Sequence, residues 1–300
     1  MKRFITKTII ILFISIVPVS FLMIKMPNNW SKNSHEINVA LAHERLESLK
    51  NCNKIIIISG SSGCFGFDSQ IIADSMHMPV VNTSIHAGMG IRMSFEIYKT
   101  FINKDDIVIF CPEYYTGTSR LYGGVALFRI LSTHMPEAYR YMNLAQWYNT
   151  FKNIGGHFKE AVKSFNYHSF EGPYSANSIN QFGDIEYERK HECVNFYSIK
   201  GEMDQATLSY YQYIHDLSKD RGFTLIHLPP ILAESAFKNQ KLQIDSLNLF
   251  MNKNNIPFQA TPERYSFPDS LFFDTSYHLT SIGAKKRTMY VIEDIKRLIE

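Results

Sequence analysis

The sequence predicts an α/β protein with a parallel sheet, of the flavodoxin-like three-layer sandwich type. Three uninterrupted apolar runs, within residues 54–62, 78–84 and 105–113, are typical of strands buried on both faces. Helical patterns and short loops separate these runs, which favours right-handed crossovers between parallel strands. In such a sheet, ligands bind at the carboxyl ends of the strands.

The expected elements follow in order along the chain. A short helix at 36–51 precedes strand one. Asp68 or Ser69 can cap a helix that runs to Met76, because both side chains accept backbone N–H groups. The remaining expected elements are strand two, a helix at 90–102, strand three, a helix at 203–221, a strand at 223–230, a helix at 233–254, a weak strand at 256–260 and a helix at 280–299 that begins near Thr280 or Ser281.

Residues 114–202 interrupt this alternation, and we interpret them as an insertion after strand three that is helical to about residue 165 and loop-like beyond. Its position allows it to cover the carboxyl end of the sheet. The insertion is rich in aromatic residues, which either pack its own small core or form a surface on which sugar rings stack. These aromatic residues are Tyr114, Tyr115, Tyr122, Trp147, Tyr148, Phe151, Phe158, Tyr167, Phe170 and Tyr174.

The N-terminal sequence predicts a membrane anchor over residues 1–27. We expect a polar linker and a short helix to follow at 28–53, and the α/β domain to occupy 54–300. Seventeen uncharged residues separate Lys7 from Lys25, close to the lower limit for crossing a bilayer core. A cleaved signal peptide and a buried helix are the alternatives. Basic residues before the segment favour a body outside the cytoplasm, and the opposite orientation remains an alternative.

Charge and cysteine content exclude several classes of protein. Residues 1–29 hold four basic side chains and no acid, so the rest of the chain carries 27 basic and 28 acidic side chains. The body therefore offers no electrostatic basis for binding nucleic acid. The spacing of Cys52, Cys64, Cys111 and Cys193 does not match a metal site, and their disulfide pairing stays open. We expect neither a metal nor a cofactor.

Three loops at predicted strand ends carry residues suited to nucleophilic catalysis. Residues 60–66, Gly-Ser-Ser-Gly-Cys-Phe-Gly, place serines on a sharp turn after strand one, where nearby N–H groups can stabilise an oxyanion. No Lys-Ser or Lys-Thr pair follows, so the turn is not a phosphate-binding P-loop. Residues 82–90 supply glycines and His86 after strand two. Asp274 and His278 lie in one loop before the last helix, as a base and its orienting acid require.

Together these segments resemble the SGNH/GDSL hydrolase superfamily, in its bacterial cell-envelope branch that includes polysaccharide O-acetylation proteins. Gly60-Ser61-Ser62 with Gly66 has the spacing of the first block, which implies Ser62 as nucleophile and Ser61 in place of an aspartate. The resemblance implies Gly88 as an oxyanion donor and His278 with Asp274 as base and acid. The ending YHLTSIGAKKRT is similar to the HLN…G…RT endings of that branch. The resemblance covers residues 54–113 and 223–300.

Two positions depart from the family pattern. Asp274 precedes His278 by four residues rather than three, and Thr275 stands where the acid is usual. Glu113 occupies the place of the third-block asparagine. An ionised glutamate opposes an oxyanion, so Glu113 either acts when protonated, orients a substrate hydroxyl, replaces Asp274 as the partner of His278, or only caps a loop.

The resulting expectation is a membrane-anchored, extracytoplasmic serine esterase or O-acyltransferase that acts on acyl, chiefly acetyl, esters of a cell-envelope glycan. Its partners are that ester and, through residues 1–27, the lipid bilayer. His86 is expected to line the pocket, Cys64 is a less favoured nucleophile, and residues 285–287 are expected on a solvated helix face. The alternative is a catalytically inactive relative that binds or assembles glycan.

Overall fold

The computed structural model describes residues 1–26, 28–114, 118–168, 171–192, 203–256 and 259–299. It is an α/β fold built on a four-stranded parallel sheet with the strand order β2-β1-β3-β4. The strands are β1 (Ile55–Ile58), β2 (Val80–Asn82), β3 (Ile107–Phe110) and β4 (Thr224–His227). This order matches the first four strands of flavodoxin-like sheets and is compatible with the expected sandwich.

The register and burial of the strands follow from their composition. Ile55 pairs with Val80 on one side and with Ile107 on the other, and Ile107 pairs with Thr224. Every residue of β1 and β3 is buried, as expected for central strands covered on both faces. Their side chains are β-branched or aromatic, which favours extended backbone and fills the core between the helices.

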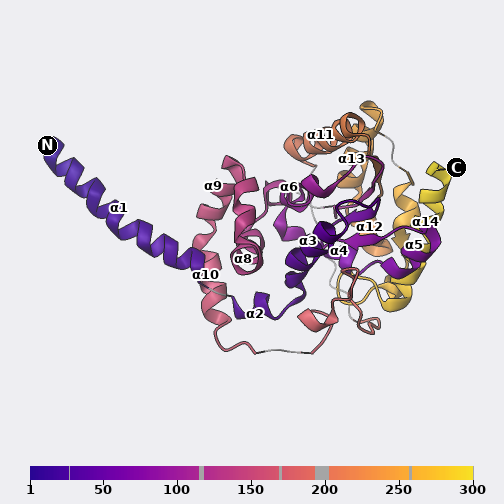
Figure 1. Ribbon diagram of the computed structural model, residues 1–300, viewed down its shortest axis with the longest axis horizontal. Helices are drawn as coiled ribbons and strands as arrows, with labels where there is room; N and C mark the ends of the chain where they lie inside the picture. Colours follow the sequence, from indigo (N-terminus) through magenta and orange to yellow (C-terminus); the bar gives the residue numbers. More distant parts are fainter. Residues whose placement is uncertain (27, 115–117, 169–170, 193–202, 257–258, 300) are drawn as a thin grey trace.

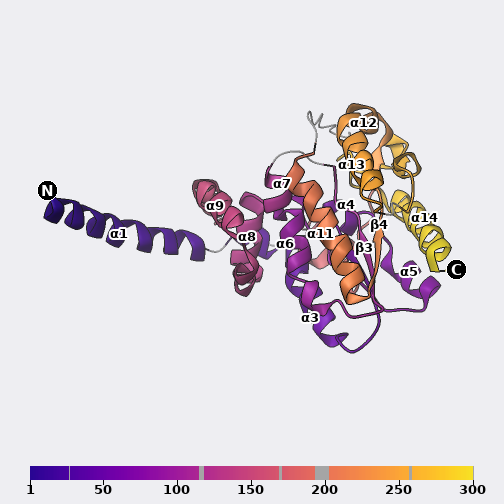
Figure 2. The same cartoon turned by 90° about the horizontal axis from the view of Figure 1, so that it is seen from above.

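Helices cover both faces of the sheet, as Figure 2 shows. On one side lie α3 (Asn38–Ser48), α6 (Ile91–Glu96) and α11 (Gln205–Arg221). On the other lie α5 (Ser69–Met76) and α14 (Ser281–Ile299). Helix α5 begins where expected, because the Asp68 side chain accepts the N–H of Ile71.

Several predicted helices are shorter or divided in the structure. Helix 36–51 consists of the 3₁₀ turn η1 (His35–Ile37) and α3, and helix 90–102 consists of α6 and the 3₁₀ turn η3 (Lys99–Phe101). Helix 233–254 breaks at Gln240 into α12 (Glu234–Asn239) and α13 (Lys241–Lys253). A small parallel pair, β5 (Leu232–Ala233) with β6 (Ser266–Phe267), was not predicted. The 3₁₀ turns η6 (Pro262–Tyr265) and η7 (Asp269–Leu271) flank β6.

The insertion is helical in its first half and loop-like in its second, as predicted. Its helices are α7 (Thr118–Tyr122), α8 (Val125–His134), α9 (Leu144–Lys152) and α10 (Ile154–Lys163), with the 3₁₀ turns η4 (Pro136–Tyr141) and η5 (Ala176–Ser178). Its aromatic side chains divide: Tyr114 is buried, whereas Tyr148 and Phe151 are exposed. Tyr115, Phe170, Cys193 and the middle of the weak strand 256–260 lie outside the described residues.

The N-terminal segment forms α1 (Lys2–Lys25), which extends away from the body beside α10 (Figure 1). The expected membrane-spanning helix is not found: in the described part of the chain, no helix is both long and apolar enough to cross a membrane.

The segment expected as a polar linker packs against the body of the protein. Residues 29–32 form α2 (Asn29–Lys32), and Ser31 and Glu36 are fully buried. The Ser31 hydroxyl donates to the Glu36 carboxylate at 2.6 Å, and Arg129 of α8 pairs with the same carboxylate. The ion pair and the hydrogen bond satisfy polar groups that would otherwise be buried without partners.

Candidate active site

The first loop of the site turns directly from β1 into a short helix, α4 (Ser61–Cys64), with Gly60 at its N-cap. The Ser61 hydroxyl oxygen lies 2.8 Å from Nε2 of His278. Ser62 is fully buried instead, and its hydroxyl lies 3.1 Å from that of Ser59. Successive side chains on a helix diverge by about 100°, so only one of two adjacent serines can face the imidazole. In this structure that serine is Ser61, not the expected Ser62.

The histidine and its acid come from the loop between η7 and α14. Nδ1 of His278 lies 2.9 Å from Oδ1 of Asp274, despite the four-residue spacing. The Thr275 hydroxyl accepts the N–H of His278 at 3.1 Å and thereby closes the turn that brings the two side chains together. An ionised carboxylate only accepts hydrogen bonds, so we assign the proton to Nδ1, which leaves Nε2 free to accept the Ser61 hydroxyl.

The electrostatics of the loop suit this arrangement. Burial by itself would raise the pKa of Asp274, but the hydrogen bond and charge of His278 and the Tyr174 hydroxyl outweigh it and lower the pKa. Asp274 is therefore the anionic partner of the imidazole near neutral pH. The His278 ring also stacks on Phe65 at 4.3 Å between centroids, with 12° between the planes. That contact restricts rotation of the ring.

Glu113, just after the carboxyl end of β3, accepts hydrogen bonds from the backbone N–H groups on either side of Ser61. Its carboxylate accepts the N–H of Ser62 at 2.7 Å and that of Gly60 at 3.2 Å, and its side chain is buried. A Cβ at position 60 would lie 2.2 Å from a Glu113 oxygen, so glycine there is required for this approach. Asp274, not Glu113, is the carboxylate hydrogen-bonded to His278, so the alternative in which Glu113 replaces Asp274 as the acid is wrong.

The second predicted loop lies beside Glu113 but does not reach Ser61 by any described hydrogen bond. The N–H of Gly88, the expected oxyanion donor, donates to Nδ1 of His86 at 2.9 Å. Burial lowers the pKa of His86, although the Glu36 charge opposes the effect. Gly88 and His86 are thus engaged with each other in this conformation.

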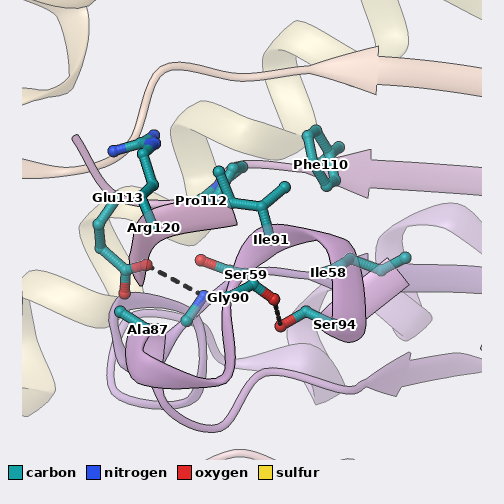
Figure 3. A pocket seen from close by; sticks show the side chains of 11 residues that line it. Ile58, Ser59, Ala87, Gly90, Ile91, Ser94, Phe110, Pro112, Glu113 and Arg120 are labelled. Atoms are coloured by element: carbon teal, nitrogen blue, oxygen red, sulfur yellow. Dashed lines mark hydrogen bonds between the residues drawn. The ribbon is translucent and has the colours of Figure 1, made fainter. Parts of the chain in front are cut away.

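A small apolar cavity lies behind Glu113, where the ends of β1 and β3 meet the second loop. Figure 3 shows Ile58, Ala87 and Phe110 among its walls. Its volume is about 10 Å³, which is room for about one water molecule.

Arg287 of α14 stabilises the turn at residues 60–66, a role that the sequence did not predict. It is fully buried, and Nη1 donates to the Ser62 carbonyl at 2.6 Å. Its guanidinium lies over the Phe67 ring at 4.1 Å. A Cβ at Gly66 would meet both the Ser62 carbonyl oxygen, at 2.2 Å, and Arg287 Nη1, at 2.5 Å. The expectation that residues 285–287 form a solvated face is therefore wrong for Arg287, because α14 directs it into the core.

Other candidates are excluded from direct chemistry. Cys64 is fully buried, and burial, assisted by the Glu113 charge, raises the pKa of its thiol so that the nucleophilic thiolate is disfavoured. Cys52, Cys64 and Cys111 are free thiols. Within the residues described, no cluster of three or more His, Cys, Asp or Glu side chains could hold a metal ion.

Comparison with protein-family models and with curated proteins gives no match for this chain. The SGNH/GDSL resemblance therefore stays a prediction from the motifs. The structure adds three residues that sequence reasoning missed: Phe65, Tyr174 and Arg287. The aromatic richness of the insertion was the one available signal for Tyr174, and it did not single out that residue.

Proposed function

We propose that this chain is a serine-dependent acyl-transfer enzyme with Ser61 as nucleophile, His278 as general base and acid, and Asp274 as the acid that orients His278. The observation that carries the proposal is the continuous hydrogen-bond series from Ser61 Oγ to His278 Nε2, at 2.8 Å, and from His278 Nδ1 to Asp274, at 2.9 Å. Both distances lie within reach for direct proton transfer. Ser61 is half-buried rather than enclosed, so its hydroxyl remains accessible to a substrate.

The reaction follows from this geometry. Ser61 Oγ attacks the carbonyl carbon of an ester while its proton passes to Nε2 of His278. The imidazolium, held by Asp274, returns that proton to the departing alcohol, and an acyl-serine remains. Water or a sugar hydroxyl then attacks the acyl carbon and gives its proton to Nε2. The imidazolium passes that proton to Ser61 Oγ as the bond between Oγ and the acyl carbon breaks, which restores the free serine. Water as acceptor makes the protein an esterase, and a sugar hydroxyl makes it an O-acyltransferase.

The developing oxyanion requires N–H donors. The donors beside Ser61 are hydrogen-bonded to Glu113, so these hydrogen bonds must break before the oxyanion can be bound. The N–H groups of Gly60 and Ser62 flank the nucleophile and point to the Glu113 carboxylate. We infer that the substrate carbonyl oxygen displaces this carboxylate and accepts the same hydrogen bonds. The N–H of Gly60 thereby takes the role that the sequence assigned to Gly88.

The substrate class rests on the motif resemblance, which favours an acyl, chiefly acetyl, ester of a cell-envelope glycan. The flavodoxin-like sandwich, the location outside the cytoplasm and contact with a bilayer through the N-terminal segment stay predictions from the sequence.

One observation favours a second function, a catalytically inactive protein that binds glycan. Glu113 satisfies both N–H donors beside Ser61, so the oxyanion site is filled by the chain itself. A protein that never performs acyl transfer can keep this closed arrangement, and its scaffold can still bind a ligand.

The full chain treated with a fluorophosphonate separates the two functions. Mass spectrometry should locate the adduct on Ser61, and Ser61→Ala and His278→Gln should abolish it. Ser209→Ala, which changes an exposed serine on α11, serves as the matched control and should label normally. An adduct on Ser62 or Cys64 would show a different nucleophile. No labelling of the folded chain would overturn the catalytic proposal in favour of binding.

A further inference from the structure

Tyr174, in the loop half of the insertion, contacts both partners of the proposed acid–base pair. Its hydroxyl donates to Oδ2 of Asp274 and lies 3.1 Å from Nδ1 of His278. Oδ1 of the same carboxylate faces Nδ1. The three polar groups therefore form a closed triangle on the side of the imidazole remote from Ser61.

We propose that Tyr174 is a positioning residue that holds Asp274 and the Nδ1–H tautomer of His278 in the geometry needed to activate Ser61. This inference rests on the proposed function. The Tyr174 hydroxyl has one proton, which it gives to Asp274, so its oxygen lone pairs face the Nδ1–H of His278. The carboxylate is then anchored through one oxygen and free to orient the imidazole through the other.

The ring of Tyr174 is held independently of its hydroxyl. It packs against Phe65 at 5.1 Å and against His35 at 5.5 Å between centroids. Burial, together with the hydrogen bond to Asp274, raises the pKa of Tyr174, so the phenol stays protonated and keeps its donor. A phenylalanine at this position would preserve the ring contacts and remove only the hydroxyl.

The backbone around Tyr174 is tied to the N-terminal segment of the chain. The Tyr174 carbonyl accepts the N–H of His35 at 2.8 Å, and Ala176 donates to the Asn33 carbonyl at 2.9 Å. Ser34 and Ser175 form an antiparallel bridge between the same two segments. The packed segment 28–36 thereby positions Tyr174, which links the unexpected burial of the linker to the chemistry of the site.

The test compares the full chain with its Tyr174→Phe variant by two measurements. The first is the rate of fluorophosphonate reaction at Ser61, which we expect to fall about tenfold, as for loss of one hydrogen bond to a charged group. The second is the downfield proton resonance of His278 Nδ1–H by NMR, assigned by its absence in His278→Gln, which we expect to move. Tyr187→Phe removes the hydroxyl of a half-exposed tyrosine in the same loop and is the matched control.

The inference stands only when both measurements change in Tyr174→Phe and neither changes in Tyr187→Phe. A slower reaction with an unmoved resonance would show that the Tyr174 hydroxyl does not act by positioning the Nδ1–H of His278, and would overturn the positioning role. An unchanged reaction rate would overturn it as well. If Ser61 of the unaltered chain fails to react at all, the proposed function fails and this inference fails with it, which is a distinct result from a reactive Ser61 that ignores Tyr174.

Discussion

Glu113 accepts the backbone N–H of Ser62 at 2.7 Å, directly beside the hydroxyl-bearing Ser61 that faces His278. The chain thus supplies an acceptor at the place where an ester oxygen would need to be stabilised. Under the proposed mechanism, the Glu113 carboxylate must move away from the two N–H groups before they can bind the substrate oxygen.

Removal of the Glu113 carboxylate is expected to speed the reaction of Ser61. In Glu113→Ala, the N–H groups of Gly60 and Ser62 become free for the phosphonyl oxygen of a fluorophosphonate. We expect labelling of Ser61 to accelerate about tenfold, the equivalent of one displaced charge-assisted hydrogen bond. Glu263→Ala, at an exposed glutamate in η6, is the control. Slower labelling in Glu113→Ala would contradict the displacement step and show that the carboxylate assists Ser61.

A side chain at position 60 is expected to destabilise the protein through Glu113. The added Cβ of Gly60→Ala would lie 2.2 Å from the carboxylate, so the variant should lose about 1–3 kcal/mol of unfolding free energy in urea. In Gly60→Ala combined with Glu113→Ala, the two losses should not add, because the clash is gone. Gly124→Ala, where a Cβ meets no atom within 4 Å, should leave stability nearly unchanged. Additive losses would refute the steric explanation.

Arg287 is expected to stabilise the serine turn. Arg287→Met keeps an apolar side chain over Phe67 but leaves the Ser62 carbonyl without its donor. The free energy of unfolding should fall by about 1–3 kcal/mol, the usual effect of leaving a buried acceptor unpaired. Lys285→Met, at an exposed position two residues earlier on α14, should change it by less than about 0.5 kcal/mol. Equal effects of both substitutions would argue against a buried role for Arg287.

The contribution of Asp184 to the free energy of unfolding is expected to fall as pH rises from about 4 to about 6. Burial raises its pKa from the ordinary 3.8 to about 6, although hydrogen bonds from Asn82 and Ser69 oppose the effect. Between these values the folded chain binds more protons than the unfolded chain, so its contribution is present at low pH and lost through pH 6. Asp184→Asn should remove a pH-dependent difference of about 2 kcal/mol between pH 4 and pH 7.

Urea unfolding at the two pH values measures this difference. Asp74→Asn, at an exposed aspartate on α5, is the matched control and should retain the pH dependence of the unaltered chain. If Asp184→Asn retains it as well, Asp184 does not titrate in this range.

Apolar runs and helix caps are local signals, so the four strands of the main sheet and most helices that cover it could be predicted from the sequence. The isoleucine run 55–58 and the Asp68 cap were both predicted, and both occur. Asp274 and His278 were also found from the sequence, since only three residues lie between them and one turn can join their side chains.

The serine that meets the histidine could not be predicted, because Ser61 and Ser62 are chemically equal and differ only in their direction on α4. The tertiary structure also decided the place of Tyr174, which reaches Asp274 across 100 residues of chain through contacts with the N-terminal segment. The burial of Arg287 was also not predictable. It depends on which part of the protein packs against that face of α14, and the polarity pattern of the helix does not specify this. Long-range packing sets these directions, whereas local patterns set the elements that carry them.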